Sequence, residues 1–531
     1  MEALALTLGH NSSAVLIKDG AVLAGYEEER LSGIKSDSHF PANAMNELDS
    51  RFDLSTVDFV CVSHWDTFAD VKGMSSKHWD PFFVEKMCPR STILSHTANF
   101  THHDAHKEMA RLYSGLKGYT IVADGFGNFN EVISVYYEDD LIHRVHGYDK
   151  SLGLLYQYAT AFLGLKMNQD EYKLLGYEAH VDQIKPEIYT ILSSHIARIS
   201  KLYVLSTLTK PVSPSFDAVC SIEALPAVRD SIHKHLKKAV NEMKTAADMS
   251  DFDIKVCIAH LVQSVVEQSM VGLVGKFNMR QVTLAGGLFY NVKLNNAIMK
   301  KVEQISVLPI AGDQGCGMGV YQHNFKDLAF PDDLCIGIRD LEYLYLDHPK
   351  CKIRYDGTPY WEEIAADLRD NKIVNVVKGN MEFGPRALGN TTTLMQPTAE
   401  NVDYVNHLNG RSTVMPCAPI VTTLDYFEDN HKVVRSYEHM IITMDYVEDK
   451  WKENRGAAHK YPFLDKYSGR PQLIYPSHWL HPVVSEFGLL INTSYNKHGA
   501  PILFTHKQIT ETFLYQVQRD TEDRVVTYII K

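Results

Sequence analysis

Apolar runs and polar turns alternate in two stretches of the chain that share one pattern. Residues 3–30 and 119–148 each hold an apolar strand, a small polar turn, a second strand, an acidic turn and a third strand. Apolar runs bounded by such turns predict antiparallel hairpins. We interpret the two stretches as a repeated three-strand meander. Two unrelated meanders are the alternative.

Segments with apolar residues three and four positions apart follow the meanders and predict helices. They span residues 41–52, 104–114, 151–165 and 252–277. An apolar strand at 281–287 precedes another helical segment at 288–302, so strands and helices alternate. This alternation predicts the α/β class. With the repeated meander, it favours a duplicated phosphate-handling fold of the kind found in actin-like ATPases.

Helical periodicity is lost between residues 328 and 360, where Pro and Asp become frequent. We place a domain boundary near residue 350, which divides the chain into units of 1–350 and 351–531. The second unit has the size of one domain and contains strand-like runs at 372–379, 415–424, 439–447 and 488–494. It is therefore predicted to be a separate α/β domain.

The composition of the 531 residues, 45% hydrophobic and 22% charged, is that of a globular enzyme. A formal net charge of −12 gives no global attraction to nucleic acid, although a local basic groove stays open. The eight cysteines are scattered and form no CxxC pair, which indicates reduced thiols and a cytoplasmic location. We expect no signal peptide, and no apolar span near the ~20 residues that a membrane helix requires.

The segment HHDAH places His102 and His106 four residues apart, on one face of a predicted helix. Two imidazoles so placed can chelate one metal ion. His103 and Asp104 point elsewhere, and either could orient a ligand through a hydrogen bond. The chain has 25 histidines, so an incidental surface pair explains the spacing equally well.

Two aspartates stand where strands meet glycine-rich turns. Asp124 ends an apolar strand and is followed by Gly125, whose backbone could face a phosphate while the carboxylate faces a metal. Asp313 lies among glycines before a helix of small residues, where packing explains a carboxylate poorly. It is a natural oxygen ligand beside two imidazoles. For Asp124, a simple hairpin turn is the alternative.

Three further motifs carry polar groups at element ends. Gly286 and Gly287 join a strand to a helix, and Asn291 follows just beyond them. Such glycines commonly bring the backbone against a nucleotide, and tight packing of the strand and helix is the alternative explanation. Arg386 follows a rigid Gly-Pro turn and suits bidentate binding of phosphate or carboxylate. Residues 492–496 cluster hydroxyls and amides that could grip a small polar acid or form an ordinary turn.

These motifs, in this order, resemble the NodU/CmcH family of O-carbamoyltransferases over nearly the whole chain. The matching segments are GHNSSAVLIKDG, HHDAH, ADGFGN, DEYKLLG, LAGGLFYN, GDQGCGMG, MEFGPRALGN and LLINTSYN. The resemblance implies an actin-like first domain and a YrdC-like second domain with a twisted open α/β sheet. It implies that the second domain makes carbamoyl adenylate from carbamoyl phosphate and ATP. The first domain then passes the carbamoyl group to a hydroxyl and releases AMP.

The resemblance also implies roles for single residues. A divalent metal, Fe(II), Zn(II) or Mn(II), would be held by His102, His106, Asp124 and Asp313. The adenylate would be surrounded by Gly125, Gly286, Gly287 and Asn291, with Lys173 as a phosphate contact. Carbamoyl phosphate and ATP with Mg(II) would be bound by Arg386, Arg411, Asn492 and Ser494. His10 would position or deprotonate the acceptor hydroxyl, since a neutral imidazole suits this near pH 7.

The chain departs from the family pattern at four positions. Asn409 and Met415 stand where the family has Lys and Arg, which puts details of the phosphate pocket in doubt. Gly33 and Asn11 stand where Arg and Asp are common, near the presumed acceptor site. An unusual acceptor would fit the last two changes.

The acceptor class stays open between a sugar or natural product and a 5-hydroxymethyl pyrimidine of a nucleotide or DNA. Trp65, Trp79 and Phe82 precede HHDAH and could stack on a base or sugar, or pack in the core. A threonylcarbamoyl-type tRNA modification enzyme and a non-catalytic actin-like nucleotide-binding scaffold are the alternative functions. No membrane partner is expected, and a homodimer is left open.

Overall fold

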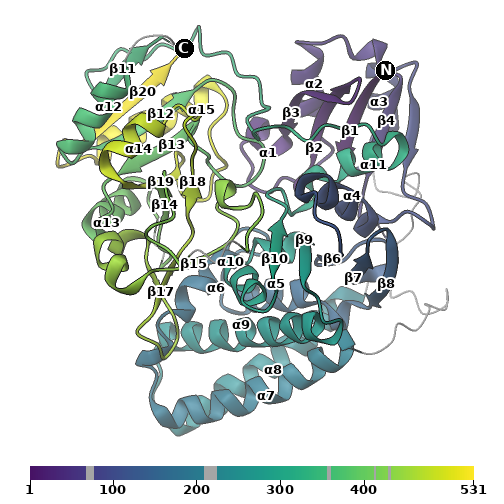
Figure 1. The fold of residues 1–531 in the computed structure, drawn as a ribbon, viewed down its shortest axis with the longest axis vertical. Coiled ribbons are helices and arrows are strands. Elements are labelled where there is room, and N and C mark those ends of the chain that lie inside the picture. The colour runs from purple at the N-terminus through teal and green to yellow at the C-terminus, as the bar shows by residue number, and fades with distance from the viewer. Residues whose placement is uncertain (67–76, 209–223, 356–359, 412–413, 429–431) are drawn as a thin grey trace.

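The computed structural model describes residues 1–66, 77–208, 224–355, 360–411, 414–428 and 432–531. It contains two five-stranded sheets, a seven-stranded sheet and a three-stranded sheet, with helices around them. Figure 1 places the first five-stranded sheet and the seven-stranded sheet on opposite sides at the top, and the second five-stranded sheet below them. The protein is therefore a mixed α/β protein, as the alternation of elements predicts.

The two five-stranded sheets have the same topology. The first is formed by β1 (Glu2–Thr7), β2 (Ser13–Lys18), β3 (Ala21–Glu27), β4 (Phe59–Ser63) and β5 (Thr92–Ser95) in the order β3-β2-β1-β4-β5. The second is formed by β6 (Tyr119–Ala123), β7 (Glu131–Tyr137), β8 (Asp140–His146), β9 (Gln281–Ala285) and β10 (Gln304–Val307) in the order β8-β7-β6-β9-β10. In each, three antiparallel strands are followed by two parallel ones. Both predicted meanders are confirmed.

Two helices lie between these sheets. They are α4 (His102–Ser114), which packs on β6 and β9, and α11 (Cys316–Phe325), which packs on β1 and β4. The helices also contact each other, and glycines make this approach possible. A Cβ at Gly319 would lie 2.3 Å from the carbonyl oxygen of Ala105, and one at Gly317 would lie 2.7 Å from that of Leu6. The glycines of GDQGCGMG thus bring α11 against both β1 and α4.

A layer of long helices lies at the bottom of Figure 1. It contains α7 (Pro186–Leu208), α8 (Leu225–Ala246) and α9 (Asp251–Lys276), and α5 (Leu152–Phe162), α6 (Glu171–Glu178) and α10 (Val292–Met299) pack on it. By length and composition α9 could cross a membrane, so the expectation that no such span exists is wrong on those criteria. However, 72% of its most apolar window is buried inside the protein, as in the core helix of a globular protein.

The seven-stranded sheet belongs to the C-terminal part. Its strands in order are β11 (Cys351–Arg354), β20 (Val525–Ile530), β12 (Ile373–Lys378), β13 (Thr391–Met395), β19 (Leu489–Ser494), β14 (Ala418–Val421) and β18 (Gln472–Leu473). The helices of this part are α12 (Tyr360–Arg369), α13 (Ala399–Leu408), α14 (His481–Phe487) and α15 (His506–Arg519). Three of the four strand-like runs predicted for this part are confirmed.

The fourth run, residues 439–447, is a correction. Only Met444–Asp445 form a strand, β15, which joins β16 (His459–Lys460) and β17 (Tyr467–Gly469) in the three-stranded sheet. The apolar side chains before β15 are buried, but side chains of α10 satisfy their backbone. Asn295 donates to the carbonyl of Ile441 at 2.7 Å, and Asn296 donates to that of Thr443 at 2.6 Å. The hydrophobic periodicity of a segment carries no information about hydrogen bonds from a distant helix.

Candidate active site

Four predicted metal ligands meet between the two five-stranded sheets. His102 and His106 come from the first turns of α4, Asp124 follows β6, and Asp313 begins the turn before α11. The Nε2 atoms of the histidines are 3.2 Å apart. A carboxylate oxygen of Asp124 lies 3.3 Å from His106 Nε2 and 3.8 Å from His102 Nε2. A carboxylate oxygen of Asp313 lies 3.5 Å from His106 Nε2 and 3.4 Å from His102 Nε2. All four side chains are largely buried.

These separations fit the edges of a small coordination polyhedron. Metal bonds of about 2.0–2.2 Å to nitrogen and oxygen give tetrahedral edges of about 3.4 Å. Asp124 Oδ2 is buried without a hydrogen-bond partner among the described residues, which is unusual for a carboxylate oxygen. Two imidazoles and two carboxylates suit a borderline divalent ion. The donor set therefore fits the metal that the resemblance implies.

Electrostatics also favour positive charge at this position. Burial lowers the pKa of His102, but the Asp313 carboxylate outweighs this and raises that pKa to about 10. Burial raises the pKa of Asp124, but the two imidazoles outweigh it and hold that pKa well below its usual range. Both shifts mean that the two carboxylates stabilise a positive charge at this position.

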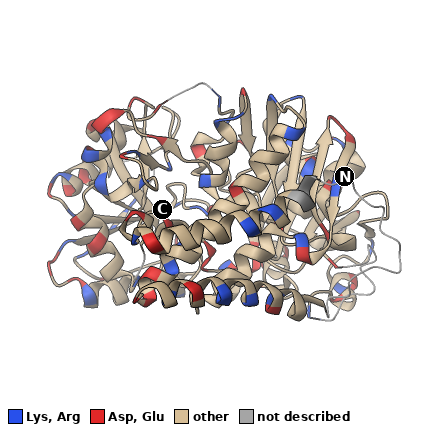
Figure 2. Ribbon diagram, turned by 90° about the horizontal axis from the view of Figure 1, so that it is seen from below, with Lys and Arg blue, Asp and Glu red and all other residues tan. Residues whose placement is uncertain are grey.

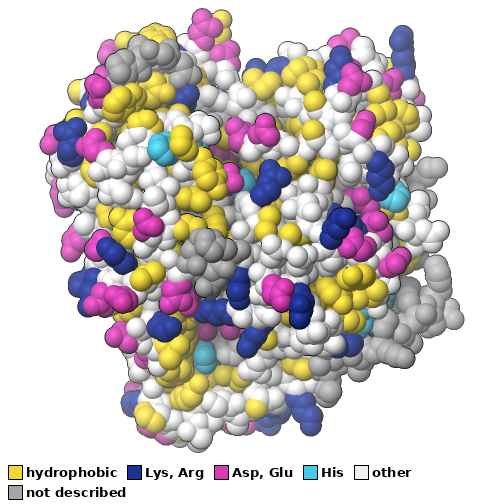
Figure 3. Space-filling view, viewed as in Figure 1, with side chains coloured by type: hydrophobic (Ala, Val, Ile, Leu, Met, Phe, Trp, Pro, Cys, Tyr) yellow, Lys and Arg dark blue, Asp and Glu magenta, His cyan; other side chains and the backbone are white. Residues whose placement is uncertain are grey.

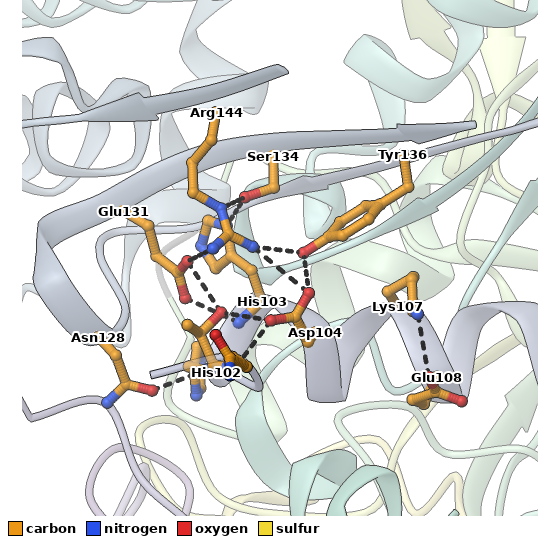
Figure 4. A network of polar contacts seen from close by, with 12 residues as sticks. His102, His103, Asp104, Lys107, Glu108, Asn128, Glu131, Ser134, Tyr136 and Arg144 are labelled. Atoms are coloured by element: carbon orange, nitrogen blue, oxygen red, sulfur yellow. Dashed lines mark hydrogen bonds and ion pairs between the residues drawn. The ribbon is translucent and has the colours of Figure 1, made fainter. Parts of the chain in front are cut away.

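A buried polar network fixes the start of α4 (Figure 4). The Asn128 carboxamide accepts from the backbone N–H of His102 at 2.8 Å, and Glu131 accepts from that of His103 at 2.9 Å. Arg144 in turn lies 3.1 Å from Glu131. Asp104 accepts from the backbone N–H of Thr101, which caps the helix. His103 Nδ1 lies 2.8 Å from the hydroxyl of Ser134, and Asp104 caps the helix, so both side chains fix the position of the helix.

The predicted glycines lie at the carboxyl ends of the parallel strands β6 and β9, beside Asp124. Gly286 has φ +99°, and a Cβ there would lie 2.2 Å from the carbonyl oxygen of Ala123. A Cβ at Gly287 would lie 3.1 Å from Asp124 Oδ1, and the N–H of Gly125 donates to that same oxygen at 2.6 Å. Glycine at 286 and 287 thus permits close packing against Ala123 and Asp124 at the edge of the cluster, which is the structural alternative to a nucleotide contact.

Asn291 has a structural explanation. Its side chain caps α10 by accepting from the N–H of Leu294 at 3.0 Å, and it donates to Gln263 at 2.7 Å. These bonds occupy both ends of the carboxamide. The predicted adenylate contact from Asn291 would have to displace one of them.

His10 and Lys173 come from two different elements of the N-terminal part. His10 sits in the β1–β2 turn, and its Nε2 is buried without a partner among the residues that the structure describes. Lys173 on α6 is 8% exposed, pairs with Asp170 at 2.8 Å and lies 3.5 Å from the ring of His498. Lys173 therefore connects the N-terminal part to His498 of the C-terminal part.

Two arginines approach each other in the C-terminal part. Burial lowers the pKa of Arg386 to about 10, partly offset by Tyr290. Burial and the charge of Arg386 hold the pKa of Arg470 well below its usual range. Neither guanidinium has a carboxylate within ion-pair distance in the described part of the chain, and Arg386 Nε is buried without a partner. Adjacent uncompensated cations of this kind form an anion site.

Arg470 was not predicted from the sequence. It follows Gly469 on the short strand β17, and no motif marks it. Together with Cys417, Met415 and Lys293, it lines a small, partly open cavity between the two parts of the chain. Met415, one of the two family departures, therefore gives this cavity an apolar wall where the family has a cation.

The remaining predicted residues surround Arg386 or lie behind it. Asn492 donates to the carbonyl of Ala387 at 2.9 Å and to Gln472 at 2.6 Å, so it supports the loop that carries Arg386. Ser494 donates to Asn496 at 2.9 Å. Arg411 has a buried Nε without a partner among the described residues. Asn409 Oδ1 accepts from Gln516 at 2.7 Å, while its Nδ2 is buried without a partner among the described residues.

Of the three aromatic residues before HHDAH, one lies beside the cluster. Trp65 meets Phe126 edge to face with centroids 5.3 Å apart and covers Gly9. Trp79 packs on Phe40 in the core, while Phe82 is 81% exposed. Trp65 is thus the member of this trio placed to contact an acceptor.

Comparison with known families defines the class of this protein. Residues 76–321 match the model described as Carbamoyltransferase N-terminus, and residues 365–521 match that described as Carbamoyltransferase C-terminus. The two models together span most of the chain in the expected order. The chain belongs to the carbamoyltransferase family and is an enzyme of that class, as the sequence motifs predict.

Two of the similar proteins match almost the full length of the chain, and a third matches about a quarter of it. A Methanocaldococcus jannaschii protein described as uncharacterized is 26% identical, with 95% of each chain covered. Nodulation protein NolNO of Sinorhizobium fredii is 24% identical over 99% of this chain and 79% of its own. Nodulation protein U of Rhizobium tropici is 31% identical over 27% of this chain and 25% of its own.

Solved structures resemble separate parts of the chain. A HypF in a phosphate- and nucleotide-bound form is 14% identical over 62% of this chain and 56% of its own, with a TM-score of 0.30. A Sua5 variant from P. abyssi is 13% identical over 34% of this chain and 49% of its own, with a TM-score of 0.23. With TM-scores this low, the α/β class of the chain rests on its own sheets.

Proposed function

We propose that this chain is an ATP-dependent O-carbamoyltransferase with two chemical sites. In the first reaction, carbamoyl phosphate, ATP and one water give carbamoyl adenylate, pyrophosphate and phosphate. In the second, the acceptor oxygen attacks the carbamoyl carbon, the bond from that carbon to the AMP oxygen breaks, and the hydroxyl proton passes to a base. The observation that carries this proposal is the close approach of a buried His/Asp cluster and an uncompensated arginine pair.

The arginine pair is the proposed site of activation. Arg386 and Arg470, with Arg411, would bind the anionic carbamoyl phosphate and the phosphates of ATP, which arrives with Mg(II). Carbamate is a poor electrophile because resonance stabilises it, and a mixed anhydride with AMP supplies a good leaving group. Fixed guanidinium groups would also stabilise charge as the anhydride forms. Asn492 would hold the Arg386 loop through its bond to Ala387.

The His/Asp cluster is the proposed site of transfer. A bound Fe(II), Zn(II) or Mn(II) would anchor the adenylate phosphate and polarise the carbonyl. His102, His106, Asp124 and Asp313 would hold that ion. His10 would take the acceptor proton, because its Nε2 is free of partners among the described residues. Gly125, Gly286 and Gly287 would let the adenylate lie against the backbone.

Tyr290 lies between residues of the two proposed sites. Gln314, next to Asp313, donates to the hydroxyl of Tyr290 at 2.6 Å, and Tyr290 interacts electrostatically with Arg386. A Cβ at Gly384 would lie 3.0 Å from Ile310 in the segment leading to Asp313. Adjacent sites would shorten the path of a labile adenylate and shield it from water.

We assign residues 1–350 to a duplicated actin-like domain and residues 351–531 to a YrdC-like domain. The equal topology of the two five-stranded sheets supports the first assignment, and the seven-stranded sheet that begins at Cys351 supports the boundary. We propose a cytoplasmic location, because the cysteines that the structure describes are all free.

The proposed acceptor is a hydroxyl of a sugar or natural product, or of a 5-hydroxymethyl pyrimidine in a nucleotide or DNA. Acidic and basic residues are interspersed along the ribbon in Figure 2, and their side chains are interspersed over the face seen in Figure 3. With a net charge of −12, this favours a small acceptor over a DNA duplex. Offering labelled carbamoyl phosphate with aminoglycosides, sugars, hydroxymethyl-dCMP and hydroxymethylated DNA would identify the class.

Two substitutions test the assignment of sites. His106→Ala should abolish carbamoylated product and lower metal content, while pyrophosphate release from ATP and carbamoyl phosphate persists. Arg386→Ala should abolish pyrophosphate release and leave metal content unchanged. His235→Ala, on α8, serves as the control and should alter neither readout. If the His106 variant still forms carbamoylated product, the proposed transfer at the metal centre is wrong.

A further inference from the structure

Cys316 lies within reach of the two imidazoles of the metal cluster. It begins α11, three residues after Asp313, and is 1% exposed. Its Sγ and one nitrogen each of His102 and His106 all lie within 4.8 Å of one another. Sequence reasoning did not single this residue out, because a single cysteine among glycines has no ligand spacing of its own.

The histidine pair is shared by two different sets of donors. One set adds the carboxylates of Asp124 and Asp313, and the other adds the thiol of Cys316. No group of the described residues brings the thiol within 4.8 Å of both carboxylates. An ion drawn towards Cys316 would therefore loosen its bonds to oxygen. The two sets differ in softness, because thiolates favour soft or borderline ions and carboxylates favour hard ones.

Packing alone explains other buried cysteines better than it explains Cys316. Cys61 and Cys257 are fully buried on β4 and α9, and neither belongs to a candidate metal group among the described residues. Cys316 also packs in an apolar cluster, with Ala105 and Met109 of α4. However, its sulfur reaches the same two imidazoles that approach Asp124 Oδ2, which lies 3.3 Å from His106 Nε2 and has no hydrogen-bond partner among the described residues. A cation at this position would contact that oxygen and both imidazoles.

We propose that Cys316 is an alternative metal ligand, so that this centre binds different ions through two different sets of ligands. Mn(II), a hard ion, binds through the histidines and carboxylates. Zn(II), Co(II) and Cd(II) recruit the Cys316 thiolate, and the thiol proton passes to solvent as the metal–sulfur bond forms. This inference rests on the metal centre proposed above. It adds that the identity of the bound ion decides whether Asp124 and Asp313 both remain bound to the metal.

Spectroscopy of the full chain tests the proposal directly. Titration with Co(II) or Cd(II) should produce a sulfur-to-metal charge-transfer band in the wild-type protein. Cys316→Ser and Cys316→Ala should remove that band and weaken Cd(II) binding by about tenfold or more, with Mn(II) affinity changed less than about twofold. Cys257→Ser is the matched control and should retain the band.

Zinc X-ray absorption of the wild-type protein gives a test that needs no variant. A sulfur shell at about 2.3 Å, beside nitrogen and oxygen at about 2.0–2.1 Å, is expected for a His/Cys site. If the absorption spectrum shows only nitrogen and oxygen neighbours around zinc, Cys316 is not a ligand, although the metal centre itself stands. A charge-transfer band that persists in both Cys316 variants leads to the same conclusion. Failure of Mn(II), Zn(II) and Cd(II) to bind at all would overturn the metal centre itself, and this inference with it.

Discussion

Glu27 accepts a hydrogen bond from the backbone N–H of Gly384 at 2.9 Å, although the two residues are 357 positions apart. Arg30 completes the contact, since it donates to the carbonyl of Gly384 at 2.5 Å and to Glu27 at 2.8 Å. Glu27 and Arg30 are each 1% exposed. Because Gly384 and Pro385 directly precede Arg386, the end of β3 and the start of α1 (Glu28–Ser32) hold the loop of the proposed activation site.

Glu27→Gln should therefore weaken activation although it lies in the N-terminal part. A neutral side chain leaves Arg30 less compensated, so the Gly384 loop should lose its fixed position. We expect KM for carbamoyl phosphate to rise about tenfold, equivalent to about 1.4 kcal/mol, in a pyrophosphate-release assay with kcat changed less. Glu28→Gln is the control, since Glu28 is equally buried but bonds to Asn43 and Ala44 instead. Equal effects of both variants would indicate only a general loss of stability.

Arg470→Ala should reduce the affinity of the folded protein for phosphate and carbamoyl phosphate. Removing one of two adjacent guanidiniums takes away charge-assisted hydrogen bonds to the anion, worth about 1.5–3 kcal/mol, or roughly ten- to a hundredfold in Kd. Isothermal titration measures this. Arg354→Ala is the control, because Arg354 is already paired with Glu363 and lies on edge strand β11. Unchanged binding in the Arg470 variant would remove it from the anion site.

The fold and the site differ in how far the sequence predicts them. The meanders were predictable because alternation and turn residues act locally, and α4 was predictable from its apolar spacing. Asp124 and Asp313 could be singled out because carboxylates next to glycines at strand ends are poorly explained by packing. Their meeting with His102 could not be derived locally, since it depends on the contact of α4 with α11, which Gly319 permits.

Other features depend on contacts that leave no local pattern. Arg470 lies near Arg386 although the two residues are 84 positions apart in the chain. Glu27 reaches Gly384 across the whole chain. The run at 439–447 has the composition of a strand, but Asn295 and Asn296 take its carbonyls. In each case the decisive partner is distant in sequence, so propensity and periodicity carry no information about it.

Gly286→Ala should destabilise the protein strongly. The residue has φ +99°, and a Cβ would lie 2.2 Å from the Ala123 carbonyl oxygen, so strand β6 would have to shift. We expect a loss of about 2–4 kcal/mol in the free energy of unfolding, measured by chemical denaturation. Gly272→Ala in helix α9 meets no atom within 4 Å and should instead stabilise by up to about 1 kcal/mol. A Gly286 variant as stable as the wild type would contradict the tight contact between β6 and β9.

Glu267 should make stability depend on pH. Burial and the negative charge of Glu178 raise the pKa of Glu267 from 4.5 to about 7. Below about pH 4.5 the folded and unfolded chains both hold this proton, and stability is at its fullest. As pH rises towards 7, the unfolded chain ionises first, so this contribution to stability is lost by about pH 7.

Glu267→Gln removes the titration and should restore stability at high pH. The shift corresponds to at most about 3 kcal/mol, and solvent at this partly exposed side chain reduces the expected gain to about 1–2 kcal/mol at pH 8. The gain should shrink towards zero near pH 4.5, as measured by urea denaturation at both pH values. Glu303→Gln is the control, because its carboxylate is 63% exposed and should show no such pH dependence. A gain of equal size at both pH values would mean that the substitution acts through packing and not through the ionisation of Glu267.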